Sequence, residues 1–277
     1  MNNNLLNRLS LVLLLGGILA FTACQKNDEG IQESINVESA ESNAIADNEM
    51  SNVDAFMEDM INAEPQLHGL VAAPESLPAC ATRSYNHETR TMVIDFGKTN
   101  CMCRDGKNRR GKIVSVFQGR PHTDKATVTT NLVDYYVNDM QHTGIREVTF
   151  VNRDIKYVVV RDASVITPNG TISWKAERII ERIAGGDTHR LADDVYLIKG
   201  KATGVNRKGV AYNAVTEKPL KKVLAPGCAQ HFVSGILTIK NANGHTVKLN
   251  YDPTGKEPCD NIAEVTVNGH SKTITLR

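Results

Sequence analysis

The sequence predicts an all-β protein, built as a large antiparallel meander and preceded by a short N-terminal helix. From about residue 79 to the C-terminus, apolar and polar residues alternate, as at Met92, Ile94 and Phe96, with the period that buries one face of a strand. Turn dipeptides such as Asn-Gly and Asp-Gly separate these runs and favour tight hairpins between antiparallel neighbours. We therefore expect a single β-rich domain over residues 79–277, either curled into an open half-barrel or paired as a sandwich.

The expected strands are short runs in which β-branched residues are frequent, as the extended backbone favours. They are 91–96, 112–118, 126–133, 146–151, 155–166, 171–183, 195–201, 209–214, 231–239, 247–251, 263–267 and 271–276. The segment from Trp174 to Ile183 also fits one face of a helix. Its β-branched residues and the Gly185-Gly186 pair that follows favour a strand instead.

The first 24 residues have the features of a bacterial lipoprotein signal. Arg8 precedes an apolar run over residues 9–21 that is too short to span a bilayer as a helix. The motif Phe21-Thr22-Ala23-Cys24 resembles a lipobox, in which the signal peptidase cuts before the cysteine. We expect residues 1–23 to be a signal peptide and Cys24 to carry the lipid, which would hold the protein at a membrane. An ordinary secretory signal is the alternative.

An acidic segment separates this signal from the strands. Residues 25–64 hold eleven Asp and Glu but only one basic residue, Lys26. The part over residues 24–50 is rich in Ser, Asn and Ala and predicts a lipidated, disordered tether. Residues 51–64 begin with a Ser cap and predict an amphipathic helix that packs on the β domain. Its apolar residues at helical spacing are Val53, Phe56, Met57, Met60 and Ile61.

The charge of the chain is unevenly distributed. The 277 residues sum to a formal charge of +1, which excludes a uniformly basic nucleic-acid binder. From residue 65 onward, however, lie 30 of the 32 Lys and Arg and only 20 of the 31 Asp and Glu, a formal charge of +10. Such a domain suits an anionic envelope component or glycan as ligand, or a solvated face near an anionic membrane.

The densest basic cluster falls in an expected loop and the strand after it. Its residues are Arg104, Lys107, Arg109, Arg110 and Lys112. Aromatic residues are not interleaved with them, as a single-stranded nucleic-acid platform would require. We therefore expect no nucleic-acid partner.

Five cysteines remain after Cys24, an odd number that fits an exported domain with two disulfides and one free thiol. They are Cys80, Cys101, Cys103, Cys228 and Cys259. Cys80 is expected to pair with Cys101, for which Cys103 could substitute because residues i and i+2 of a strand share a face. Cys228 is expected to pair with Cys259. A metal site at Cys101 and Cys103 would need two further ligands nearby, so no metal or cofactor is expected.

Catalytic motifs are incomplete. Asp95-Phe96-Gly97 resembles a kinase triplet but lacks the nucleotide-binding loop and the catalytic loop of kinases. Asp193 and Asp194 are adjacent acids that would point to opposite faces of a strand, unlike the paired carboxyls of a glycosidase. No nucleophile elbow, zinc-protease motif or phosphate-binding loop is present. The sequence therefore predicts no catalytic residues.

Several blocks together resemble a group of uncharacterised Bacteroidota surface lipoproteins. They are Val93-Ile94-Asp95-Phe96-Gly97 with Cys101, the run 105–113, the run 194–200, and Cys259-Asp260-Asn261 before a Val-Asn-Gly hairpin. The resemblance covers about residues 79–277. It implies a β-rich fold and a lipid-anchored location at the outer membrane, facing either the periplasm or the cell surface, but no activity.

The function expected from these features is that of a non-enzymatic binding or structural module of the cell envelope, attached to the membrane through its lipid. One alternative is a hydrolase acting on glycans or lipids. Another is a carrier of lipids or lipoproteins with an open half-barrel. The carrier alternative requires an apolar concave cavity.

Overall fold

The computed structural model describes residues 26–64, 67, 74, 76–188 and 190–276. The chain divides into two compact units, Met1–Ser34 and Ile35–Arg277. The expected signal peptide over residues 1–23 and the expected lipid attachment site Cys24 lie outside the described residues. All contacts of side chains given below belong to the second unit.

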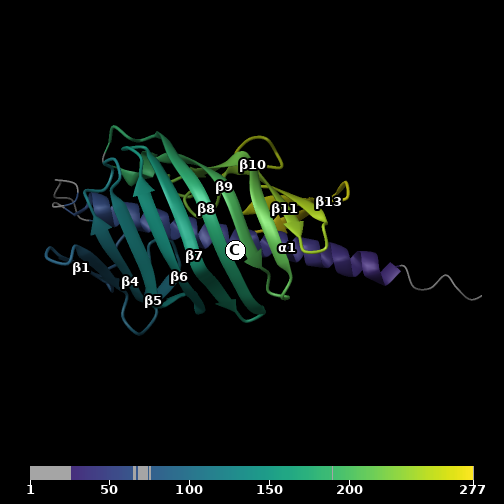
Figure 1. Cartoon of the computed structure of the whole chain (residues 1–277), viewed down its shortest axis with the longest axis horizontal. Coiled ribbons are helices and arrows are strands. Elements are labelled where there is room, and N and C mark those ends of the chain that lie inside the picture. The colour runs from purple at the N-terminus through teal and green to yellow at the C-terminus, as the bar shows by residue number, and fades with distance from the viewer. Residues whose placement is uncertain (1–25, 65–66, 68–73, 75, 189, 277) are drawn as a thin grey trace, which may run out of the picture. The chain divides into compact units, whose positions relative to one another are not determined.

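The second unit is mostly β-structure, as predicted, and its strands form one open antiparallel sheet (Figure 1). The sheet order is β1-β2-β4 and then consecutive strands to β14, with β3 paired only to β4. The strands are β1 (Thr82–Asn86), β2 (Thr91–Asp95), β3 (Cys101–Met102), β4 (Asn108–Gln118), β5 (Thr127–Val137), β6 (Met140–Phe150), β7 (Ile155–Thr167), β8 (Gly170–Ala184), β9 (Val195–Val205), β10 (Ala211–Val223), β11 (Ser234–Asn241), β12 (Thr246–Asn250), β13 (Ile262–Val267) and β14 (His270–Thr275). A short 3-10 helix, Leu191–Asp193, precedes β9.

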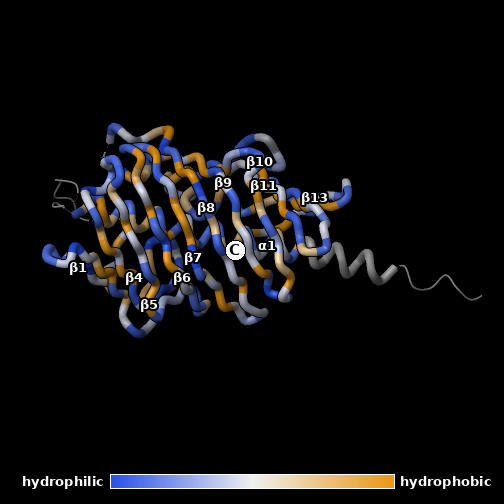
Figure 2. Tube along the Cα trace, in the orientation of Figure 1, coloured by the Kyte–Doolittle hydropathy of each residue, from blue (hydrophilic) through white to orange (hydrophobic). Residues whose placement is uncertain are grey.

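Each strand has a buried inner face and an exposed outer face. In β8, Ile172, Trp174 and Ala176 are buried, whereas Ser173 and Lys175 between them are exposed. The alternation of apolar and polar residues along the strands is visible in Figure 2. The segment from Trp174 to Ile183, whose sequence also fitted a helix, therefore belongs to strand β8, which is hydrogen-bonded to β7 and β9.

Some strands are longer than predicted. Strand β10 was expected to end at residue 214, yet it continues to Val223 through Pro219. The pairing of β10 shifts register between Val215 and Leu220, so Pro219 lies in an irregular stretch where its missing N–H is tolerated. Strand β6 begins at Met140 rather than at residue 146, and its register irregularity near Gly144 interrupts the alternation that sequence analysis relies on.

The N-terminal helix differs most from prediction. Helix α1 runs over Lys26–Asn62, 37 residues, so the disordered tether predicted over residues 24–50 and the helix start predicted at Ser51 were wrong. Residues 26–50 are helical. From Val37 onward most side chains of α1 are buried, including polar ones. The acidic composition that resembled a tether is instead that of a buried helix.

The part of helix α1 that belongs to the second unit, residues 35–62, packs against the inner face of the sheet, which curves around it. Arg83 on β1, Lys156 on β7 and Lys222 on β10 all hydrogen-bond to residues of α1. The turn before β11 also reaches the turn before β4, because Gln230 Nε2 donates to the carbonyl oxygen of Asp105 at 3.0 Å. The structure is therefore a curled, open sheet whose concave side holds a helix.

Met60 of α1 provides a test of this packing. Its side chain is fully buried in the core between helix and sheet. We expect Met60→Ala to lower the free energy of unfolding by about 2–5 kcal/mol, because it leaves a cavity. Met102, which is 59% exposed, is the matched control, and Met102→Ala should have little effect. Denaturant unfolding measures both, and equal effects of the two variants would contradict this packing.

Candidate functional site

The inner face of the sheet carries buried cations among its apolar residues. They are Arg109, Arg146, Lys156, Arg178 and Lys222, each less than 10% exposed. Arg178 shares this face with Ala176 and Ile180 because alternate residues of a strand point the same way. Burying a charge is costly unless it is paired and hydrogen-bonded. The partners of these cations therefore decide what the site can do.

Helix α1 supplies carboxylates to most of these cations. Asp47, Asp54 and Glu58 are seven and four residues apart and so lie on one face of the helix. They meet three neighbouring strands. Asp47 Oδ1 is 2.7 Å from Nη2 of Arg178 on β8, Glu58 Oε2 is 3.0 Å from Nζ of Lys156 on β7, and Asp54 pairs with Arg146 on β6.

Further ion pairs connect other acidic residues of α1, and one just after it, to the β-rich part of the chain. Glu49 Oε1 is 2.7 Å from Lys107 Nζ, and both side chains are almost buried. Arg207, in the turn between β9 and β10, pairs with Glu38 and Glu41 near the start of the buried part of α1. Glu64, just after the helix, lies 3.7 Å from Arg83. The result is a line of charge pairs along α1 from Glu38 to Glu64.

The electrostatics of Glu58 show how strongly the sheet stabilises these carboxylates. Burial would raise the pKa of Glu58, but the charges of Lys156 and His122 hold that pKa well below its usual range. His122 Nε2 is 2.9 Å from Glu58 Oε1. Glu49 behaves alike, since Lys107 and His142 outweigh the effect of burial and lower its pKa. Both groups are carboxylates in the folded protein at neutral pH.

Lys222 is an exception among the inner cations. Its Nζ donates to Asn52 Oδ1 at 3.1 Å and to Asn48 Oδ1 at 3.4 Å, and no carboxylate of the described residues lies within ion-pair distance. Burial, reinforced by the charge of Lys107 and opposed by Glu49, lowers the pKa of Lys222 to about 7. Near neutral pH this amine is therefore only partly protonated.

The basic cluster identified in the sequence as a candidate basic patch is largely neutralised within the protein. Lys107 pairs with Glu49, Arg109 with Asp105, Arg110 with Asp139, and Lys112 with Asp95. Arg104 is the member for which the structure shows no such pair. Four of the five cations thus already have a carboxylate partner, and the cluster is not a free basic patch.

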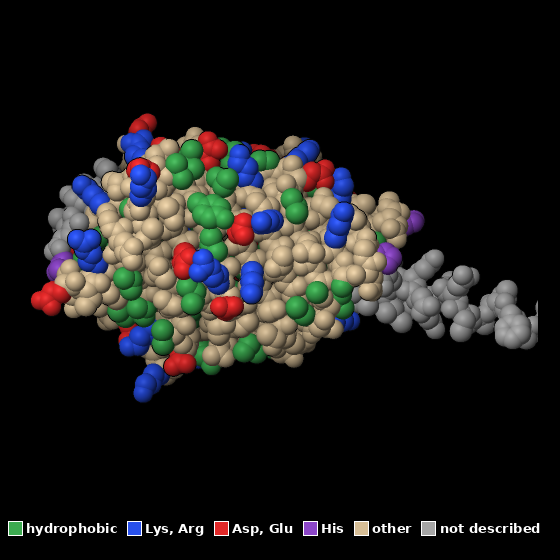
Figure 3. All heavy atoms as spheres, in the orientation of Figure 1, with side chains coloured by type: hydrophobic (Ala, Val, Ile, Leu, Met, Phe, Trp, Pro, Cys, Tyr) green, Lys and Arg blue, Asp and Glu red, His purple; other side chains and the backbone are tan. Residues whose placement is uncertain are grey.

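The net charge of the second unit also argues against a free basic surface. Residues 35–277 hold 30 Lys and Arg against 28 Asp and Glu, a formal charge of +2. The +10 counted from residue 65 onward is offset by the acids of α1, which belong to the same unit. On the face shown in Figure 3, basic and acidic side chains are interspersed with scattered apolar ones. Net charge therefore gives no reason to expect an anionic ligand.

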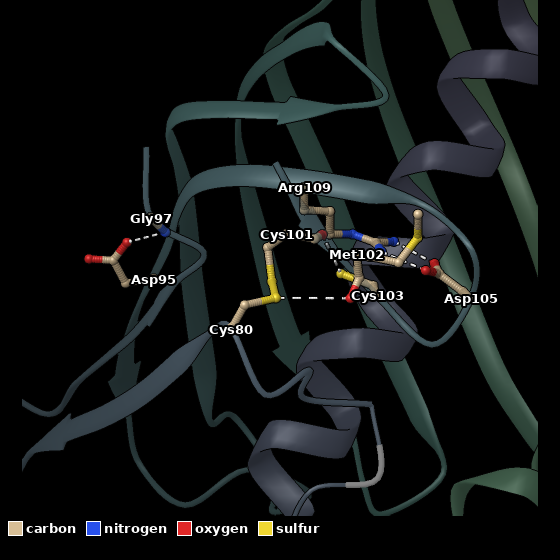
Figure 4. Close-up of a disulfide and its surroundings, with 8 residues drawn as sticks. All are labelled: Cys80, Asp95, Gly97, Cys101, Met102, Cys103, Asp105 and Arg109. Carbon is tan, nitrogen blue, oxygen red and sulfur yellow. Dashed lines mark hydrogen bonds and ion pairs between the residues drawn. A yellow bond between two sulfur atoms is a disulfide. The ribbon is translucent and has the colours of Figure 1, made fainter. Parts of the chain in front are cut away.

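The cysteines pair as first expected. Cys80 is bonded to Cys101 and Cys228 to Cys259, whereas Cys103 is a buried free thiol beside the first disulfide (Figure 4). Burial raises the pKa of the Cys103 thiol, although Arg109 acts to lower it.

The adjacent acids Asp193 and Asp194 do not form the facing pair of carboxyl groups that a glycosidase uses. Asp194 is buried and accepts a hydrogen bond from Tyr196 Oη at 2.6 Å. Asp193 instead accepts from the hydroxyl of Thr188. Among the described residues, no group of three or more His, Cys, Asp or Glu side chains is placed to hold a metal ion.

Two hollows lie between α1 and the sheet. The one against β7–β10 is lined in part by Asp54, Glu58, Lys156 and Lys222. The other lies against β5–β8, and the ring nitrogens His142 Nε2 and Trp174 Nε1 on its lining have no hydrogen-bond partner. Both are lined by apolar side chains of α1 and the sheet together with buried ionisable ones, such as Glu58 in the first and Glu49 in the second.

Sequence reasoning missed the charged residues that pair across the helix and sheet. The acids Asp47 and Glu49 were assigned to a tether. The signal that could have found them lies in the strands, where Lys156 and Arg178 occupy positions of the inward, apolar parity. A cation at such a position needs a buried anion, and the acidic segment before the sheet could supply it.

No protein-family model, curated protein or solved structure matches this chain. In the part of the chain that the structure describes, no helix is both long and apolar enough to cross a membrane.

The Asp47–Arg178 pair can be tested by removing one charge. Because Asp47→Asn leaves Arg178 buried without its counter-charge, we expect the free energy of unfolding to fall by about 3–5 kcal/mol. Glu177, the neighbour of Arg178 on β8, forms an exposed pair with Lys201, and Glu177→Gln should cost less than about 1 kcal/mol. The double variant Asp47→Leu, Arg178→Met should recover part of the loss. An Asp47→Asn protein as stable as Glu177→Gln would contradict the pairing.

Lys222 predicts a pH dependence of stability. The unfolded chain holds this proton up to about pH 10.5, whereas the folded protein releases it near pH 7. Between these values the unfolded state binds more protons, so stability rises with pH, by up to about 1.4 kcal/mol per pH unit. In Lys222→Met, the slope of the free energy of unfolding against pH should be smaller than in the wild type by up to about 1.4 kcal/mol per pH unit between pH 7.5 and 9.5. The control is Lys201→Met on the exposed face of β9, and identical slopes in the two variants would contradict the assignment.

Proposed function

We propose that this protein is a lipid-anchored, non-enzymatic module of the outer membrane whose acylated residue is Cys24. The support for the anchor is the sequence motif at residues 21–24, a cysteine directly after a short apolar run. Only Gln25 separates Cys24 from the first residue of α1, Lys26. The lipid and the sheet would thus be connected by helix rather than by the flexible tether expected from composition.

The observation that carries this proposal is the set of buried ion pairs between α1 and the sheet. Each pair, such as Asp47 with Arg178 or Glu58 with Lys156, makes removal of the helix costly because both charges would lose their partner. A helix held in this way is a firm attachment between an N-terminal anchor and a β module. It provides mechanical connection and needs no catalytic group.

The filled concave side favours a binding or structural role over a carrier role. A carrier would need an apolar hollow for acyl chains, whereas this side of the sheet holds a charged helix. Binding by the module would then use its outer face and its loops. On the outer face, apolar residues such as Tyr157 and Ile179 are partly exposed beside ion pairs such as Arg161 with Glu147.

The proposal is tested by substituting the proposed acylation site. In a bacterial host with lipoprotein processing, the wild-type protein should incorporate labelled palmitate and fractionate with outer membranes, because several acyl chains hold it there. Cys24→Ala should abolish the label and release the protein into the soluble fraction. Cys103→Ser is the matched control and should behave as wild type. Retention of Cys24→Ala in the membrane fraction would sink the proposal.

A further inference from the structure

Three sulfur atoms lie together at the junction between the segment that follows α1 and the sheet. Cys80 precedes β1 and is exposed, whereas Cys101 on β3 and Cys103 just after it are buried. The disulfide joins Cys80 to Cys101, with 5.8 Å between their Cα atoms. In Figure 4 the Cys103 side chain lies beside this disulfide, and its sulfur is 3.5 Å from the carbonyl oxygen of Cys101.

The backbone places Cys103 on the same face of the chain as Cys101. The two residues flank Met102, whose side chain points the other way and is 59% exposed. Cα atoms two residues apart on an extended chain are separated by roughly 6.6 Å, and their Cβ atoms by about as much, so a bond between Cys101 and Cys103 forms when the backbone bends at Met102. Cys103 is also fixed by backbone hydrogen bonds to Lys107 and Gly106. A free thiol is thus held next to a disulfide sulfur on the same face of the chain.

We propose that these three cysteines form a thiol–disulfide exchange site in which Cys103 is the internal nucleophile. The Cys103 thiol loses its proton to water, and the thiolate attacks Sγ of Cys101. A Cys101–Cys103 bond forms as the Cys80–Cys101 bond breaks, and the electron pair leaves on Cys80 Sγ, which then takes up a proton. The reaction consumes no oxidant or reductant.

The direction of the exchange follows from exposure. The sulfur that leaves, Cys80, is solvent-exposed, where water stabilises its thiolate, whereas Cys101 is 2% exposed. The released Cys80 is then available to a thiol or disulfide outside the protein. Exchange also frees the segment before β1, which carries Cys80, from its covalent bond to β3. The site would couple external thiol chemistry to the attachment of this segment.

Alkylation without reduction tests the exchange. The full chain carrying Cys24→Ala, so that Cys103 is the one remaining free thiol, is incubated in native buffer with iodoacetamide and then digested with trypsin without reductant. Cleavage after Lys98 and Arg104 gives one peptide, Thr99–Arg104, that contains both Cys101 and Cys103. We expect Cys80 to become alkylated while this peptide becomes two hydrogen atoms lighter than its dithiol form. The rate should rise about tenfold per pH unit below the pKa of Cys103, because the thiolate is the nucleophile.

The controls are two further substitutions in the same background. In Cys103→Ser the Cys80–Cys101 bond should persist and Cys80 should remain unlabelled. In Cys80→Ser, mild oxidation should produce the Cys101–Cys103 bond directly. Alkylation of Cys103 with the Cys80–Cys101 bond intact, no labelling at all, or two free thiols in oxidised Cys80→Ser would each overturn the proposal. These results are independent of lipid attachment, which the Cys24→Ala background removes.

Discussion

The acidic helix can lie inside this sheet only because the sheet presents cations to it. Transferring an isolated ion out of water costs several kcal/mol even after relaxation, and α1 carries Asp47, Glu49 and Glu58 at buried positions. Asp47 and Glu58 meet cations on strands β8 and β7, and Glu49 meets Lys107 in the turn before β4. A shift of one residue in the register of β8 would turn Arg178 to the outer face and leave Asp47 unpaired. The charge pairs therefore constrain both the helix position and the strand register.

The sequence contained most of the β-structure but little of the helix. Alternation of apolar and polar residues identified the strands, since that signal arises within each strand. It failed where the pairing is irregular, as around Pro219 in β10. The disulfides could be anticipated from position, because Cys80 and Cys101 flank the first strands, and Cys228 and Cys259 lie among the last hairpins. The extent of α1 could not be anticipated, because residues 26–50 resemble a disordered chain until their cationic partners, 58 to 174 residues later in the sequence, are known.

In the candidate site, too, some features were visible in the sequence and others only in the structure. The basic cluster at residues 104–112 was visible in the sequence, but its partners were not. Asp139 lies on a turn after β5, and Glu49 lies on the helix. A count of charges by sequence segment assigned +10 to the domain, whereas the folded unit, with its helix included, carries +2. Net charge becomes informative about partners only after the boundaries of the folded unit are known.

The position of α1 in the chain has a consequence for how the protein reaches its folded state. The helix precedes every strand, yet its contacts extend to Arg207 and Lys222, at sequence separations of 169 and 170 residues. Closing such long-range contacts is slow relative to local pairing. The hairpins of the meander can form one after another while the helix still lacks its partners. During synthesis, α1 therefore lacks part of its set of hydrogen-bond and ion-pair partners until strand β10, which carries Lys222, has been made.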